Sequence, residues 1–406
     1  MIATFLSLQA IRVGGLALGY GTIVLLNRSE GTAALGQYLF FLNSVIVVGT
    51  MAALGLPTLV QRLSARLGAE QIGAGTRLAV AKRWPVMAAV AGLGSVALLA
   101  LEADQPLTLV SAFALTVAAF AFALTLVLVE TLRIAREARL SETLRNLVRP
   151  ALILALLLSG LGGVWAVTIG VLASTTLVLV LTAPVLWCHP LSADPGLAPY
   201  VDERGRDLSK VFALGALGLV FGAMDVVVFG LLSGAAETGL YGAGSRYGML
   251  VNVALLAGNA QMVQHLAKVA AQTDASGASL EHLRRQVRLV RLSGTALLVA
   301  LAAMLPVYAW IVDLPTAALW PYFAVVALSF WVQGMLGPVN VFLMQMHEVD
   351  RLIHYHLWGI LVFGCVGGLL FLKGTTLAIP LGLAAGANTV KLLSWWRIHR
   401  SRELSL

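Results

Sequence analysis

The sequence predicts an all-α integral membrane protein with about twelve transmembrane helices in two six-helix lobes and with both termini in the cytoplasm. Three observations support this fold class. Of the 406 residues, 59% are hydrophobic and only 11% are charged, whereas soluble domains carry about 25% charged residues. Apolar runs long enough to cross a bilayer recur along the whole chain. Lysine and arginine concentrate in alternate loops between those runs.

The spans are predicted as runs of about 20 mostly apolar residues. Twelve ranges meet this description: 5–26, 36–57, 84–101, 107–129, 149–162, 164–187, 211–232, 239–265, 289–311, 318–343, 352–372 and 376–396. The fifth range is short, but one helix over 150–187 would be about 57 Å long, which exceeds the thickness of a bilayer core. Gly160, Gly162 and Gly163 offer a turn between two helices.

The positive charges predict the orientation. If the N-terminus is cytoplasmic, 23 of the 27 lysines and arginines lie in or beside cytoplasmic loops, and the outside loops hold only Arg28 and Lys373. This asymmetry follows the positive-inside rule. The positive-inside rule and contact with anionic lipid together explain the net charge of +8, so no nucleic-acid partner is expected.

The two halves of the chain resemble each other. Gly36 and Tyr38 match Gly239 and Tyr241 at an offset of 203 residues, which is half the chain length. Six spans separate the copies, so the repeat is parallel and its pseudo-axis runs along the membrane normal. Three further identities at the same offset lie in 58–65 and 261–268.

The repeat predicts the organisation of the chain. We expect an N-terminal lobe over 1–187, a cytoplasmic linker over 188–210 and a C-terminal lobe over 211–406, with a cleft between the lobes. The charged linker contains three prolines and separates the sixth span from the seventh. Two lobes around a cleft are an architecture for alternating access.

The sequence carries no signature of an enzyme. It lacks a G-x-x-x-x-G-K-[ST] phosphate loop, and no loop is large enough to form a catalytic domain. No catalytic residue, metal site or cofactor is predicted. His354 and His356 could chelate a metal, but nothing nearby completes a site, and a solvated turn between two helices is the favoured interpretation. The two cysteines lie far apart in sequence, and no disulfide is predicted.

Ionisable residues inside spans are costly and are therefore candidates for function. They are Arg12 in the first helix, Asp225 in the seventh and Arg246 in the eighth. Asp225 and Arg246 are ten and eleven residues from a predicted hairpin turn near Ala235, so similar depths are expected. Two interpretations stay open: an ion pair that hides both charges from lipid, or side chains that line a hydrated cavity.

Polar residues recur on two predicted helices. Their spacing favours a bundle interior or water over lipid, although hydrogen bonds between helices are the alternative. Because arginine stays ionised and forks onto phosphate oxygens, a cavity with two arginines suits an anionic substrate such as a lipid-linked sugar diphosphate. The predicted cavity residues are Arg12, Asp225, Ser245, Arg246, Asn252, Asn259, Gln333 and Asn340.

The sequence also resembles a known family. Near the N-terminus, an apolar span that contains Arg12 is followed by a loop ending in G-x-Y and a span ending in A-x-x-G-L. This pattern resembles the polysaccharide transporters, the Wzx-like O-antigen flippases of the MOP superfamily. That superfamily also contains MATE-type multidrug exporters and peptidoglycan lipid flippases. The residues that carry the likeness are Gly36, Tyr38, Leu54, Gly55 and Leu56, and in the second lobe Asp225, Gly230, Gly239, Tyr241, Ala243 and Arg246.

The resemblance implies a MATE/MOP-like fold that opens alternately to each side of the membrane. It implies outward flipping of an undecaprenyl-diphosphate-linked oligosaccharide repeat unit across the bacterial inner membrane, for surface polysaccharide biosynthesis. It further implies that Arg12 and Arg246 hold the diphosphate. Implied partners are the lipid-linked oligosaccharide, membrane lipid and polysaccharide polymerase or assembly proteins. Two alternatives stay open: a small-molecule or drug antiporter on the same fold, and a non-transporting scaffold for glycan assembly.

Overall fold

The computed structural model describes residues 2–63, 69–101, 108–135, 138–187, 201, 208–253, 255, 277–337, 339–345 and 348–400. Within these ranges the chain is helical and contains no strand. It divides into two compact units. Unit 1 comprises Met1–Ala216 and Gly230–Gly239, and unit 2 comprises Leu217–Phe229 and Leu240–Leu406. The predicted linker over 188–210 lies almost wholly outside the described residues, so the predicted lobe boundaries stay predictions.

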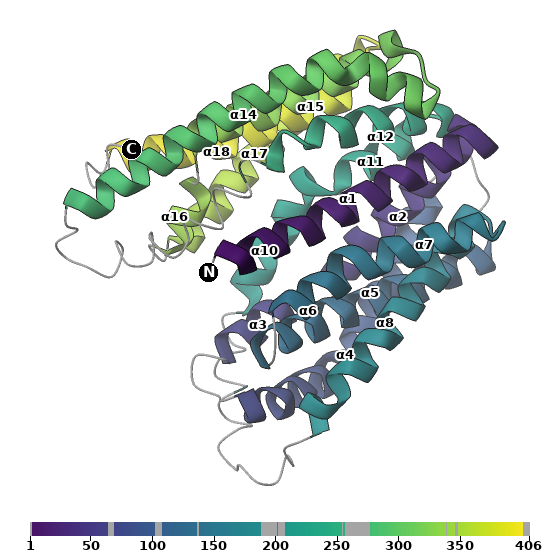
Figure 1. Ribbon diagram of the computed structural model, residues 1–406, viewed down its shortest axis with the longest axis vertical. Helices are drawn as coiled ribbons and strands as arrows, with labels where there is room; N and C mark the ends of the chain where they lie inside the picture. The colour runs from purple at the N-terminus through teal and green to yellow at the C-terminus, as the bar shows by residue number, and fades with distance from the viewer. Residues whose placement is uncertain are drawn as a thin grey trace. The chain divides into compact units, whose positions relative to one another are not determined.

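Unit 1 is built around one central helix, α5 (Leu109–Ala135), which packs against α2, α4 and α8 (Figure 1). Alanines such as Ala118, Ala119 and Ala123 are buried on α5, and their small side chains let neighbouring helices approach closely. The other elements are α1 (Ile2–Glu30), α2 (Thr32–Ala52), α3 (Leu56–Leu63), α4 (Ala69–Leu101), α6 (Ala138–Thr143), π-helix η1 (Leu144–Val148), α7 (Arg149–Leu158) and α8 (Gly163–Trp187).

Unit 2 is built around α17 (Val349–Leu372) and α18 (Ala378–Arg400), which pack along each other. Gly359 and Gly386 lie at their crossing: a Cβ atom on either would come within 2.8 Å of the other's carbonyl oxygen. The remaining helices of this unit are α14 (Gly277–Val312), α15 (Thr316–Leu336) and α16 (Val339–Gln345). Helices α10 (Leu208–Gly222), α11 (Met224–Leu232) and α12 (Ala235–Met249) contribute residues to both units.

Eight described helices are long and apolar enough to cross a membrane, or nine if α10 and α11 form one bent span. These nine correspond to nine of the twelve predicted spans. In the range 149–162, α7 has only ten residues. In the range 239–265, the described helix ends at Met249. In the range 376–396, α18 is long enough but less apolar, with Lys391 inside it. The exact count of twelve and the orientation of the termini stay predictions.

Two predicted continuous spans are broken in the structure. The span predicted over 211–232 bends by 57° where α10 ends and α11 begins. A Cβ atom on Gly218 or Gly222 near this bend would meet no described atom within 4 Å. The span predicted over 318–343 ends at Leu336, because Gly337 has a φ of 80°. This left-handed conformation is typical of a helix C-terminus.

The glycines that marked the internal repeat meet in unit 1. A Cβ atom on Gly36 of α2 would lie 1.8 Å from the carbonyl oxygen of Ala235. A Cβ atom on Gly239 of α12 would lie 2.2 Å from the carbonyl oxygen of Thr32. Each contact joins a glycine to the residue one turn before the other glycine, so the two contacts are reciprocal. A two-fold axis between α2 and the start of α12 would produce this pattern, and the parallel repeat stays a prediction.

Candidate functional site

Arg12 lies a third of the way along α1 and forks onto Glu142 of α6. Its Nε donates to Oε2 of Glu142 at 3.2 Å, and its Nη2 donates to Oε1 at 3.1 Å. Asn146 of η1 donates to Oε2 of the same carboxylate at 2.6 Å. The side chain of Arg12 is 38% exposed, whereas that of Glu142 is 13% exposed. The structure therefore gives Arg12 an acidic partner that the sequence analysis did not name.

The environment of Glu142 favours its charged form. Burial opposes the charge and by itself would raise the pKa of Glu142. Hydrogen bonds from Arg12 and Asn146 and the positive charges of Arg12 and Arg145 outweigh burial, and the pKa of Glu142 lies below its usual value of 4.5. The backbone permits this approach, because a Cβ atom on Gly15 of α1 would lie 2.0 Å from the carbonyl oxygen of Asn146.

Asp225 lies in the first turn of α11, as a result of the break after α10. The positive end of the helix dipole stabilises a carboxylate at this position. Tyr241 of α12 donates its hydroxyl to Oδ2 of Asp225 at 2.9 Å. Tyr241 is buried, stacks on Phe229 at 4.5 Å between ring centroids and meets the edge of Tyr322 at 5.5 Å. These aromatic contacts fix the phenol toward Asp225.

A small cavity within unit 2 lies beside Asp225 and Tyr241, with a volume of about 40 Å³. Ser329 and Gln333 of α15 also line it, and Nε2 of Gln333 donates to Oγ of Ser329 at 3.3 Å. Ser329 in turn donates to Oδ1 of Asn388 on α18 at 3.4 Å. A space of this size holds one or two water molecules. It fits water, a proton or a small ion.

Arg246 is partly buried in the last turn of α12. A direct ion pair between Asp225 and Arg246 stays a prediction. Ser245 is fully buried, and its hydroxyl donates to the carbonyl of Gly242 at 3.3 Å within the same helix.

The predicted polar stripes are only partly formed. Asn252 follows the end of α12 after a turn in which backbone N–H groups donate to the carbonyl three residues earlier. This turn interrupts the regular α-helical spacing between Ser245 and Asn252. Asn259 lies outside the described residues. Asn340 lies on α16, separated from Gln333 by the break in the predicted span, and its Oδ1 is buried with no hydrogen-bond partner among the described residues. Of the eight predicted residues, Asp225 and Gln333 line one cavity.

His354 and His356 lie in the first turns of α17 rather than in a solvated turn. Each ring nitrogen Nδ1 contacts a backbone carbonyl one turn earlier, at 2.7 Å for His354 and 2.8 Å for His356. His356 is buried. In the described part of the chain, no three metal-ligating side chains come together.

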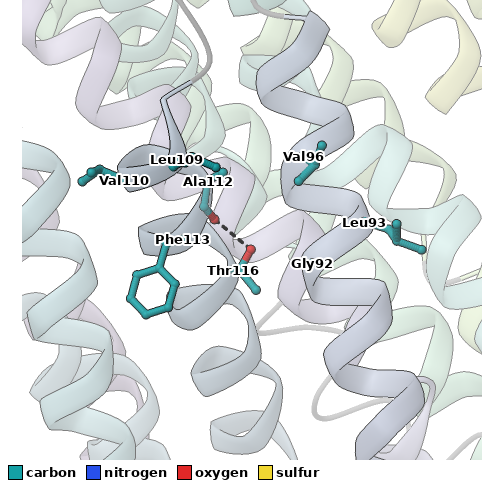
Figure 2. Close-up of a pocket in the computed structure, with 8 residues that line it drawn as sticks. All are labelled: Gly92, Leu93, Val96, Leu109, Val110, Ala112, Phe113 and Thr116. Atoms are coloured by element: carbon teal, nitrogen blue, oxygen red, sulfur yellow. Dashed lines mark hydrogen bonds between the residues drawn. The ribbon is translucent and has the colours of Figure 1, made fainter.

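An apolar groove of about 650 Å³ lies on unit 1 between α4 and α5 (Figure 2). Thr116 contributes the main polar group, and its hydroxyl donates to the carbonyl of Ala112 at 2.7 Å within α5. The groove therefore offers hydrocarbon surface and no polar anchor, which fits lipid chains. Its large apolar side chains are Leu93, Val96, Leu109, Val110 and Phe113.

The chain matches no described protein family and no curated protein sequence. It does match solved structures. The lipid II flippase MurJ in an inward closed conformation aligns with a TM-score of 0.76 and 11% identity, over 98% of this chain and 88% of MurJ. An inward-facing MATE multidrug transporter of the MOP superfamily aligns with a TM-score of 0.66 and 12% identity, over 98% of both chains. The MATE multidrug transporter DinF-BH aligns with a TM-score of 0.60 and 15% identity, over 99% of this chain and 96% of DinF-BH.

The chain has the fold of these transporters. The MATE/MOP-like fold class predicted from the sequence is therefore confirmed. With at least eight apolar helices in that fold, the chain is a multi-pass membrane protein. At 11–15% identity the likeness concerns the fold, and the Wzx-like subfamily stays a prediction.

Proposed function

We propose that the chain is a flippase for a lipid-linked oligosaccharide repeat unit carried on undecaprenyl diphosphate. In this proposal it moves the repeat unit outward across the bacterial inner membrane by alternating access, and surface polysaccharide is the end product. The lipid-linked oligosaccharide and membrane lipid are its ligands, and polysaccharide polymerase or assembly proteins are its partners. The fold shared with a lipid II flippase supports a substrate of this kind.

The observation that carries the proposal is the presence of an arginine within a predicted span in each unit, Arg12 on α1 and Arg246 on α12. Arginine remains ionised when buried and presents a planar fork of donors that matches phosphate oxygens. Two such cations favour an anionic ligand and oppose a cationic drug.

A small-molecule antiporter is the second candidate, and the cavity beside Asp225 favours it. There a carboxylate, a phenol and the amide of Gln333 surround a space that fits a proton or a small cation. The MATE transporters that share the fold support this alternative. Because a flippase could use the same cavity for coupling, the transported substrate is what separates the two candidates.

The proposal is tested with Arg246→Gln in a strain that lacks the chromosomal gene. We expect the variant to insert normally but to restore surface polysaccharide on the order of tenfold less well than the wild type, because a charge-assisted contact to phosphate is lost. Arg285→Gln is the matched control, since Arg285 is an exposed arginine on α14. Normal polysaccharide with Arg246→Gln, together with altered drug sensitivity, would favour the antiporter.

A further inference from the structure

One of the two forks with which Arg12 could bind a phosphate is occupied in this structure. Nε and Nη2 form the side-on fork of the guanidinium, and both donate to the carboxylate of Glu142. A carboxylate and a phosphate present similarly spaced oxygens to such a fork. Glu142 therefore occupies the position that an anionic ligand would need at the side-on fork of Arg12.

We propose that Glu142 is an internal counter-ion that a phosphate group displaces from Arg12, so that Glu142 sets the affinity of Arg12 for its anionic ligand. This inference rests on the proposed function for the identity of the ligand. Glu142 is then a positioning and specificity residue, because only a ligand that competes with a carboxylate can bind Arg12. A neutral lipid or sugar would leave the pair closed.

The exposure of the two side chains permits this exchange. Arg12 is 38% exposed, whereas Glu142 is 13% exposed. Arg12 is thus the more accessible partner of the pair. The pair also joins residues 130 positions apart, on α1 and α6, so its opening needs no break within a helix.

Glu142 would not be left without partners after displacement. Asn146 donates to its Oε2 at 2.6 Å, and Arg145 adds a positive charge near the carboxylate. A buried carboxylate that keeps a hydrogen bond and a nearby cation avoids most of the penalty for an unpaired charge. Asn146 and Arg145 belong to π-helix η1, and such wide turns are frequent at functional sites.

The test is chemical modification of Arg12 by phenylglyoxal in the purified full chain, mapped by mass spectrometry, with inorganic pyrophosphate as the competing anion. We expect Glu142→Gln to raise the modification rate of Arg12 about tenfold, because a charge-assisted ion pair is lost. Pyrophosphate should protect Arg12 in this variant at roughly one tenth of the concentration needed for the wild type. Glu130→Gln is the matched control. Glu130 is also buried in unit 1 and is paired with an arginine, Arg133, but within one helix. Glu130→Gln should leave the modification rate of Arg12 unchanged.

An unchanged modification rate in Glu142→Gln, or a lack of protection by pyrophosphate, would overturn the inference. Should Glu142→Gln not fold, Asn146→Ala serves instead. It removes the donor that orients the carboxylate, so a smaller rise at Arg12 is expected, and no rise would equally overturn the inference. The flippase function is read separately, from surface polysaccharide in cells that carry Arg12→Gln. If the modification results are as expected while this polysaccharide is normal, the role of Glu142 as counter-ion is retained and the proposed function is wrong.

Discussion

The reciprocal contact between Gly36 and Gly239 makes a sharp prediction for a single added methyl group. In Gly36→Ala, the new Cβ atom would lie 1.8 Å from the carbonyl oxygen of Ala235, whereas real Cβ atoms essentially never come within 3.0 Å of such an atom. The two helices must therefore separate locally by about 1.2 Å or more. The obstacle is backbone on both sides, so rotation of a side chain cannot relieve it.

Overpacking of this kind costs about 1–3 kcal/mol. For a unit of about 200 residues, that corresponds to a fall of roughly 2–12 °C in the melting temperature. The assay is thermal unfolding of the purified chain in detergent, followed by loss of the monodisperse peak in size-exclusion chromatography. Gly239→Ala should behave similarly, because its Cβ atom would lie 2.2 Å from the carbonyl oxygen of Thr32.

Gly19→Ala is the control for the general effect of alanine in a helix. A Cβ atom on Gly19 of α1 would meet no described atom within 4 Å, so this variant should be as stable as the wild type or more stable. If Gly36→Ala and Gly19→Ala melt at the same temperature, α2 and the start of α12 are not in backbone contact, and the two-fold interpretation of the repeat fails.

Three further predictions concern the polar groups and the helix break. The stabilisation that Glu142 provides relative to Glu142→Gln should be complete above about pH 4.5 and should fall as the pH drops through its lowered folded-state pKa. Melting temperatures of the two proteins between pH 8 and pH 3.5 check this. A difference in melting temperature that instead grows in acid would contradict it. Tyr241→Phe removes the hydroxyl bonded to the carboxylate of α11 and should destabilise the protein by about 1–3 kcal/mol, measured by thermal unfolding; an unchanged melting temperature would mean that water replaces the phenol. Gly337→Ala places a side chain at a φ of 80° and should destabilise by about 1 kcal/mol, whereas Gly334→Ala, three residues earlier, should not.

Much of the fold follows from hydropathy, because a membrane requires long apolar helices whatever their packing. What hydropathy misses is where such a helix breaks. The break at Gly337 had a local signal, since Pro338 follows it in the sequence and a glycine before a proline commonly ends a helix. The bend before Met224 had a weaker signal in Gly222. Both breaks matter for the site, because one places Asp225 at a helix start and the other separates Asn340 from Gln333.

The partners of the charged residues were less accessible from sequence. Arg12 pairs with Glu142, which is 130 positions away, and no local pattern encodes such a contact. Asp225 bonds Tyr241, which the sequence analysis used only as a marker of the repeat. The hairpin argument set Asp225 at the depth of Arg246, whereas the hydrogen bond that the structure shows comes from Tyr241, five residues earlier on α12.

The most direct test of the proposed function is mass spectrometry of lipid-linked oligosaccharides after deletion of the gene, with surface polysaccharide measured in parallel. The proposal predicts that a complete repeat unit accumulates on undecaprenyl diphosphate while surface polymer is lost, and that the wild-type gene reverses both effects. Unchanged lipid intermediates together with normal surface polymer would contradict the flippase function.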